Sequence, residues 1–93
     1  MRTIDASEAL DIAARRLSEL EHEAGCRLEL VPQSTQQIEQ GWVFFYNSAD
    51  FIRTGNMSDA LAGNGPLFVS IDGHITELPS SKPWRDALDE MRS

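Results

Sequence analysis

The 93-residue chain is poor in cysteine, in histidine and in long apolar runs. Its single cysteine, Cys26, rules out an internal disulfide. No apolar stretch approaches the length needed to cross a bilayer, and the first residues lack the apolar segment of a signal peptide. We therefore expect a reduced cytoplasmic protein with no membrane partner.

Basic residues are also scarce, with eight lysines and arginines against fifteen acids, so the net charge is −7. A field of this sign repels phosphate backbones and disfavours nucleic-acid binding, whereas it attracts a basic partner. A second interpretation, that the charge serves only solubility, stays open. Part of the charge lies around the end of the first expected helix, at Glu19, Glu21, Glu23 and Glu29.

The composition is that of one ordinary folded domain spanning residues 1–93, with 41% hydrophobic and 25% charged residues. Residues 5–24 predict an amphipathic helix, capped by Asp5 with Glu8 three residues later and ended by Gly25. Its expected apolar stripe is Leu10, Ala13, Leu17, Leu20 and Ala24.

Four strands are expected after this helix. Residues 26–31 alternate as a half-buried strand that ends at Pro32, and residues 33–37 read as a polar loop. A second strand runs from Gly41 or Trp42 to Asn47, and residues 67–71 and 74–78 form a hairpin around Asp72-Gly73. Between these pairs, residues 51–52 are expected to extend the second strand, residues 58–62 to form a helical turn and residues 63–66 a tight turn.

A last helix is predicted from about Pro83, with an apolar stripe that begins at Trp84. The order of elements favours an α+β fold, a four-stranded antiparallel meander with both helices packed on one face in a two-layer sandwich. Trp42, Phe44, Tyr46 and Trp84 are the expected structural core. Val43, Phe45 and Phe68 then point to the opposite face, which either residues 48–62 cover or a partner binds.

The chain offers few groups for catalysis, and we expect no enzyme, metal or cofactor and no small-molecule substrate. Ser70, Asp72 and His74 alternate along the hairpin, but a turn separates them and no oxyanion donor is evident. Cys26 follows a helix end, where the dipole disfavours a thiolate, so a buried structural thiol is expected. Two histidines and one cysteine at unrelated spacings do not predict a zinc site.

The stretch from Gly41 to Pro83 is similar to one family. It contains Gly41-Trp42-x-Phe44-x-Tyr46, Thr54-Gly55, the run Ala60-Leu61-Ala62-Gly63-Asn64-Gly65-Pro66, and a Gly-x-Ile hairpin that ends near Pro83. These motifs resemble the YrhB-like family of bacterial polymorphic-toxin immunity proteins. Its members often have a longer hairpin than the short Ile71-Asp72-Gly73 turn of this chain.

The resemblance implies a protein that neutralises a toxin domain by binding it, and the YrhB branch also implies a chaperone-like alternative that binds several clients through an apolar face. The negative charge favours a toxin with a basic surface. We expect that surface to meet an aromatic centre with an acidic rim. The expected contact residues are Phe45, Glu39, Asp50, Asp59, Asp72 and Glu77.

Overall fold

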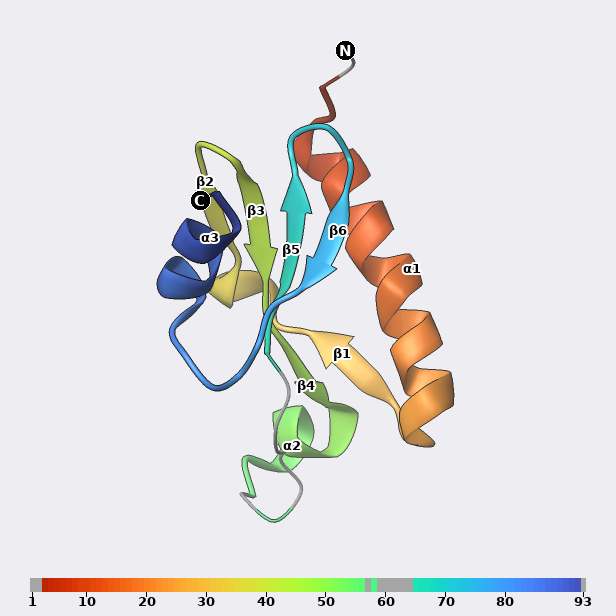
Figure 1. Ribbon diagram of the computed structural model, residues 1–93. Helices are drawn as coiled ribbons and strands as arrows, with labels where there is room; N and C mark the ends of the chain where they lie inside the picture. Colours follow the sequence, from red (N-terminus) through yellow and green to blue (C-terminus); the bar gives the residue numbers. More distant parts are fainter. Residues whose placement is uncertain (1–2, 57, 59–64, 93) are drawn as a thin grey trace.

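The computed structural model describes residues 3–56, 58 and 65–92 (Figure 1). Two helices lie on opposite sides of a twisted sheet, and a smaller strand pair with a short helix extends from one end of it. The elements in chain order are α1 (Ala6–Ala24), β1 (Leu28–Leu30), the 3-10 turn η1 (Pro32–Ser34), β2 (Gln36–Ile38), β3 (Gly41–Phe44), β4 (Tyr46–Ser48), α2 (Ala49–Thr54), β5 (Leu67–Ser70), β6 (Ile75–Glu77) and α3 (Trp84–Arg92).

The main sheet has four antiparallel strands in the order β2-β3-β5-β6, and it confirms the predicted α+β class. The segments that form the strands of this sheet differ from those predicted. The segment expected as a polar loop supplies β2, with Gln36 opposite Val43, whereas the first expected strand becomes β1 of a separate two-stranded sheet. Gln36 and Gln37 of this edge strand are exposed and only Ile38 packs against a core, so the strand shows no apolar alternation.

The expected strand from Trp42 to Asn47 is divided at Phe45 into β3 and β4. The chain leaves the main sheet after Phe44, and the Phe45 carbonyl oxygen accepts a hydrogen bond from the Val31 N–H at 2.8 Å. β4 therefore pairs with β1 rather than with β5.

Helix α1 begins and ends as predicted. Asp5 Oδ1 accepts the Glu8 N–H at 2.8 Å, and Gly25 adopts a left-handed conformation with φ of 71°. The buried stripe is shifted from the prediction, because Ala9, Ala13 and Leu17 face the sheet while Leu10 is 46% exposed. Ala24, the other end of the expected stripe, is exposed as well. The small side chains of Ala9 and Ala13 let the helix backbone approach the sheet. Sequence periodicity alone did not distinguish this stripe from the neighbouring one that contains Leu10.

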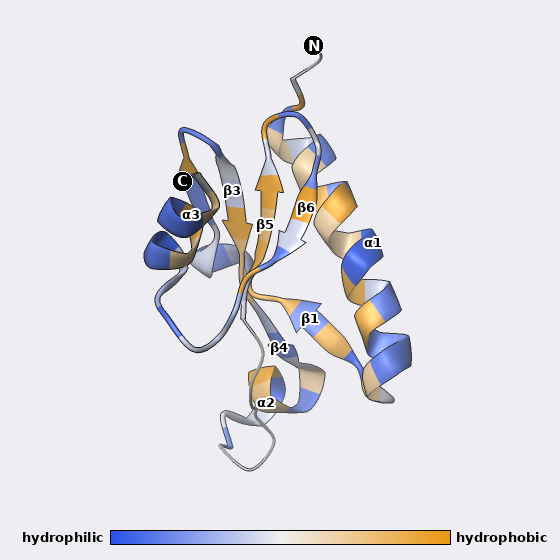
Figure 2. Cartoon of the chain, viewed as in Figure 1, coloured by the Kyte–Doolittle hydropathy of each residue, from blue (hydrophilic) through white to orange (hydrophobic). Residues whose placement is uncertain are grey.

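The two long helices cover opposite faces of the main sheet, and this corrects the expected two-layer arrangement. One core joins α1 to Trp42, Phe44, Leu67 and Val69. The second core joins Ala87 and Leu88 of α3 to the other face, through Val43, Phe68 and Leu78. Helix α3 thus covers the face for which the sequence offered only residues 48–62 or a partner. Figure 2 shows hydrophobic colour along much of β5 and on the lower part of β3, which lie between the two helices, and in bands on α1.

Residues 51–52, expected to extend a strand, lie in α2 instead. Ser48 caps this helix, since its Oγ accepts the Phe51 N–H at 3.0 Å, and Gly55 ends it in a left-handed conformation. The helical turn expected at 58–62 and the tight turn at 63–66 fall mostly outside the described residues.

Two glycines of the family-like motifs are required by close backbone approaches. A Cβ atom on Gly41 would lie 2.1 Å from the Val69 carbonyl oxygen, and one on Gly65 would lie 1.9 Å from the Leu78 carbonyl oxygen. Both distances are far below van der Waals contact, so only glycine fits. These positions explain part of the sequence signature by packing.

Candidate partner-binding surface

Ser70, Asp72 and His74 do come together at the β5–β6 turn, where their hydrogen bonds stabilise the turn. The Ser70 hydroxyl donates to Asp72 Oδ1 and accepts the His74 backbone N–H at 3.1 Å, while His74 Nδ1 lies 3.1 Å from the same Asp72 oxygen. The hydrogen bond from Ser70, and then that from His74, lower the pKa of Asp72 to about 2. A nucleophilic serine needs a base at its hydroxyl. Here the hydroxyl proton is directed to a carboxylate of very low basicity.

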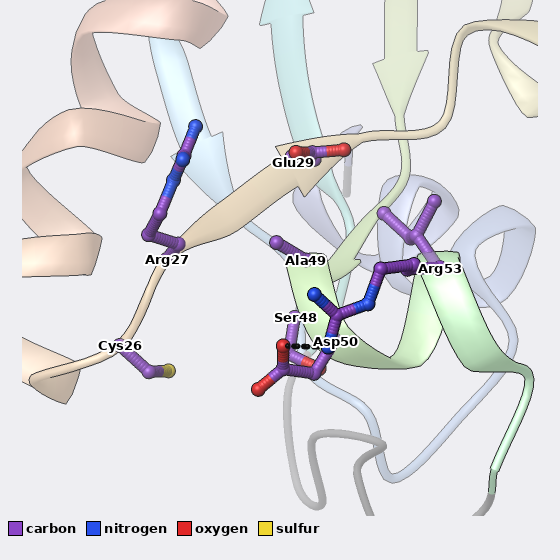
Figure 3. Close-up of a pocket in the computed structure, with 8 residues that line it drawn as sticks. Cys26, Arg27, Glu29, Ser48, Ala49, Asp50 and Arg53 are labelled. Carbon is purple, nitrogen blue, oxygen red and sulfur yellow. Dashed lines mark hydrogen bonds and ion pairs between the residues drawn. The ribbon is translucent and has the colours of Figure 1, made fainter.

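Cys26 is exposed, which corrects the expected burial of its thiol. It lines a hollow of about 600 Å³ between β1 and α2, together with Arg27, Glu29 and Asp50 (Figure 3). On the α2 side of this hollow, Arg53 Nη2 donates to Asp50 Oδ1 at 3.0 Å. Among the described residues, no three His, Cys, Asp or Glu side chains are grouped closely enough to hold a metal ion.

A second hollow, of about 340 Å³, has an aromatic lining. Phe45, Tyr46 and Trp84 contribute rings to it, Pro66 and Pro79 contribute apolar edges, and all three rings are only half-buried. The Arg85 guanidinium lies 4.5 Å from the centre of the Trp84 ring on the neighbouring surface. Half-buried aromatic rings beside an arginine have the composition typical of protein–protein contact sites.

Acidic side chains converge where α1 crosses β6. Arg16 Nε donates to Glu77 Oε2 at 3.1 Å, and its Nη1 donates to Glu19 Oε1 at 3.0 Å and lies 3.8 Å from Glu23 Oε2. Hydrogen bonds to Glu77 and then to Glu19 raise the pKa of Arg16 above its already high usual value. One positively charged guanidinium therefore lies among three carboxylates, so the net charge of this group of four side chains is negative.

The residues expected to contact a partner lie in separate places. Phe45 lines the aromatic hollow, and Asp50 lies on α2 beside the Cys26 hollow. Asp72 and Glu39 share the opposite end of the sheet, in the adjacent β5–β6 and β2–β3 turns, which are joined by the hydrogen bond from Ile71 N–H to Gln40 O at 3.0 Å. Glu77 lies on β6, and Asp59 falls outside the described residues. Trp42 and Phe44, expected in the core, are 7% and 4% exposed.

Sequence reasoning missed Arg16, although it noted the glutamates around the end of α1. The spacing of Arg16 to Glu19 and Glu23, three and seven residues, places all three on one side of a helix and gave a signal for the cluster. The contact with Glu77, 61 residues away, had no signal in the sequence.

The described residues thus form an α+β domain with an aromatic hollow and a cluster of carboxylates around Arg16. A family model described as Immunity protein 35 matches residues 7–91. The chain therefore belongs to the immunity protein 35 family.

A curated relative supports the same relation over part of the chain. The Escherichia coli K12 protein named "Uncharacterized protein YrhB" is 34% identical over 55 residues. The match covers 58% of this chain and 58% of that protein, so the chain spans just over half of the relative's length. No solved structure matches the chain. In the described part of the chain, no helix has the length and apolar character of a bilayer-spanning segment.

Proposed function

We propose that this protein is a bacterial immunity protein that binds a cognate toxin domain in the cytoplasm and neutralises it by occluding the toxin's active surface. The observation that carries the proposal is the family match, which extends over residues 7–91 and so includes all the described residues except 3–6 and 92. Its action is steric, since a bound domain of this size covers the surface at which a toxin meets its substrate.

Electrostatic attraction guides the encounter in this proposal. The net charge of −7 and the carboxylates around Arg16 favour a toxin with a basic surface, such as a nuclease or a nucleotide-using transferase. Association with such a partner slows as salt screens the charges, because the Debye length falls from about 10 Å at 0.1 M salt to about 3 Å at 1 M. In this proposal the protein belongs to a polymorphic toxin system that acts in competition between bacteria.

The aromatic hollow and the acidic residues take different parts in the contact. Phe45 provides a half-buried apolar anchor, and Asp50 lies on α2, directly after β4. Asp59, which falls outside the described residues, is a further proposed contact. Glu39, Asp72 and Glu77 form the acidic part at the turns and on β6. Their separation favours a partner that extends along the molecule rather than one that contacts a single point.

The test starts from the reading frame beside the gene for this chain. Its toxin domain is expressed with and without this protein in a host cell, and growth is measured. We expect growth to be restored by this protein, a single stoichiometric complex on co-purification, and weaker rescue by Phe45→Ala combined with Asp50→Lys. Ser58→Ala, at an exposed position, is the matched control.

Two results would contradict the proposal. A neighbouring product that is harmless, or that binds without being neutralised, removes the toxin role. Suppression of aggregation of several unrelated clients, with no stoichiometric partner, would support the chaperone-like alternative instead.

A further inference from the structure

Strand β6 is an edge strand whose outer backbone groups have no strand beside them in residues 3–56, 58 and 65–92. The Ser70 N–H donates to His74 O at 2.8 Å, and the Leu78 N–H donates to Pro66 O at 2.9 Å. In an antiparallel ladder this register directs the N–H and C=O of residues 74, 76 and 78 toward β5. The N–H and C=O groups of Ile75 and Glu77 therefore point away from the sheet.

The side chains along this edge give it a strong negative charge on the side of α1. Ile75 packs against the α1 core, so Glu77, two residues later, lies on the same side of the strand. There Glu77 joins Glu19 and Glu23 around Arg16, with side chains that are 47%, 65% and 65% exposed.

An edge of this kind discriminates between possible occupants. A second copy of the chain, with its own net charge of −7 and its own Glu77, would place like charges opposite each other and is disfavoured. A strand that carries lysine or arginine at alternate positions would meet the excess carboxylates while its backbone satisfies Ile75 and Glu77. The same charge therefore repels one class of strand and attracts another.

We infer that the outer edge of β6 is the docking site for an extended basic segment of the toxin domain, which adds to the main sheet as a fifth strand. This inference rests on the proposed function and names the surface and the partner chemistry through which neutralisation occurs. The contact is directed by backbone hydrogen bonds at Ile75 and Glu77, with charge complementarity supplied by the carboxylates around Arg16.

The test compares two substitutions at one position. Glu77→Ala removes the carboxylate and keeps the outward N–H, whereas Glu77→Pro removes both. Neither substitution removes a hydrogen bond to β5, because this N–H points outward. The probe is a synthetic eight-residue peptide of alternating lysine and threonine, with an alternating glutamate and threonine peptide as its control, titrated in low salt and followed by NMR.

We expect the lysine peptide to bind the natural protein and the glutamate peptide not to bind. Glu77→Ala weakens binding, and Glu77→Pro weakens it about fivefold further, as expected for the loss of one backbone hydrogen bond. Amide exchange at Ile75 and Glu77 slows on binding, while the Thr76 amide, already paired with β5, serves as the internal reference.

Equal binding by the alanine and proline variants, no binding of the lysine peptide, or unchanged exchange at Ile75 and Glu77 would each overturn the inference. These outcomes leave toxin neutralisation by another surface intact. Conversely, normal peptide binding by a protein that fails to rescue cells from the neighbouring gene product contradicts the proposed function. In a complex that does neutralise its toxin, Glu77→Pro must lower rescue more than Glu77→Ala does.

Discussion

Replacing Gly65 by alanine tests whether the family-like Gly-Pro motif is a packing requirement. The new Cβ atom would lie 1.9 Å from the Leu78 carbonyl oxygen and 2.8 Å from the carbonyl carbons of Leu78 and Pro79. Ordinary contact begins at 3.4 Å, so one of the two segments must move by about 1.5 Å. That movement also strains the adjacent hydrogen bond from the Leu78 N–H to Pro66 O, which is 2.9 Å long.

The expected cost follows from the rigidity of the two segments. Overpacking against backbone atoms costs typically about 1–3 kcal/mol, and a required shift of this size places Gly65→Ala near about 3 kcal/mol. The total stability of a 93-residue domain is about 5–14 kcal/mol. For a domain of this length a loss of 3 kcal/mol lowers the melting temperature by about 12–24 °C.

Gly25→Ala is the matched control, because it separates dihedral strain from steric overlap. Gly25 has a φ of 71°, and an added Cβ atom there would meet open space. Gly65 does not have a positive φ, so its substitution tests the steric overlap alone. The control should cost about 1–2 kcal/mol from the left-handed conformation alone. Thermal and urea unfolding, followed by circular dichroism, measure both variants. Equal destabilisation, or a smaller effect at Gly65, would refute the close-approach explanation.

Three further predictions follow from single side chains. Asp72→Asn should destabilise the protein at pH 7, because the ionised Asp72 carboxylate, whose pKa is lowered to about 2, stabilises the fold. The difference in stability from the natural chain should shrink as the pH falls from about 4 toward about 2 and the carboxylate is protonated. Acid titrations of both proteins at fixed denaturant check this, and a constant difference would contradict it. Trp42→Phe should change the free energy of unfolding by less than about 1 kcal/mol. The buried Trp42 Nε1 has no hydrogen-bond partner, so removing this polar group offsets the loss of apolar contact. A cost of about 3–5 kcal/mol, as for a Trp→Ala change, would instead indicate that the indole N–H makes a hydrogen bond. Cys26 should react completely with a thiol reagent in the native protein, at a rate close to that of the unfolded chain, and protection from the reagent would disprove its exposure.

The parts of the fold that the sequence predicted are those that local interactions decide. Helix α1 depends on the Asp5 cap, the Gly25 ending and its own periodicity, and all three are visible in consecutive residues. The β5–β6 hairpin likewise follows from the turn at Asp72-Gly73, where Gly73 has a φ of 91°. Local signals of this kind persist in the folded chain because tertiary contacts reinforce them.

The parts that the sequence did not predict depend on distant contacts. Strand β2 is identified by its pairing with β3, since its glutamines carry no apolar pattern. The side of the sheet on which α3 lies is decided by the path of residues 78–83, and nothing in the amphipathic stripe of α3 encodes that path. The Arg16–Glu77 contact likewise exists only once α1 crosses the main sheet.

The same division separates the family signature from the proposed partner surface. Gly41, Trp42, Phe44 and Gly65, four of the residues that carry the resemblance, lie in close backbone approaches or in the core. A substitution at any of them alters the scaffold before it alters a contact with a partner. The carboxylates of Glu19, Glu23 and Glu77 lie on exposed positions that can change without disturbing the core. Ile75 on the edge of β6, by contrast, belongs to the Gly-x-Ile motif and packs against the α1 core. Under the proposed docking, the exposed acids on α1 and β6 contribute to the choice of toxin, so we expect their exchange between two family members to exchange toxin preference and to leave stability nearly unchanged.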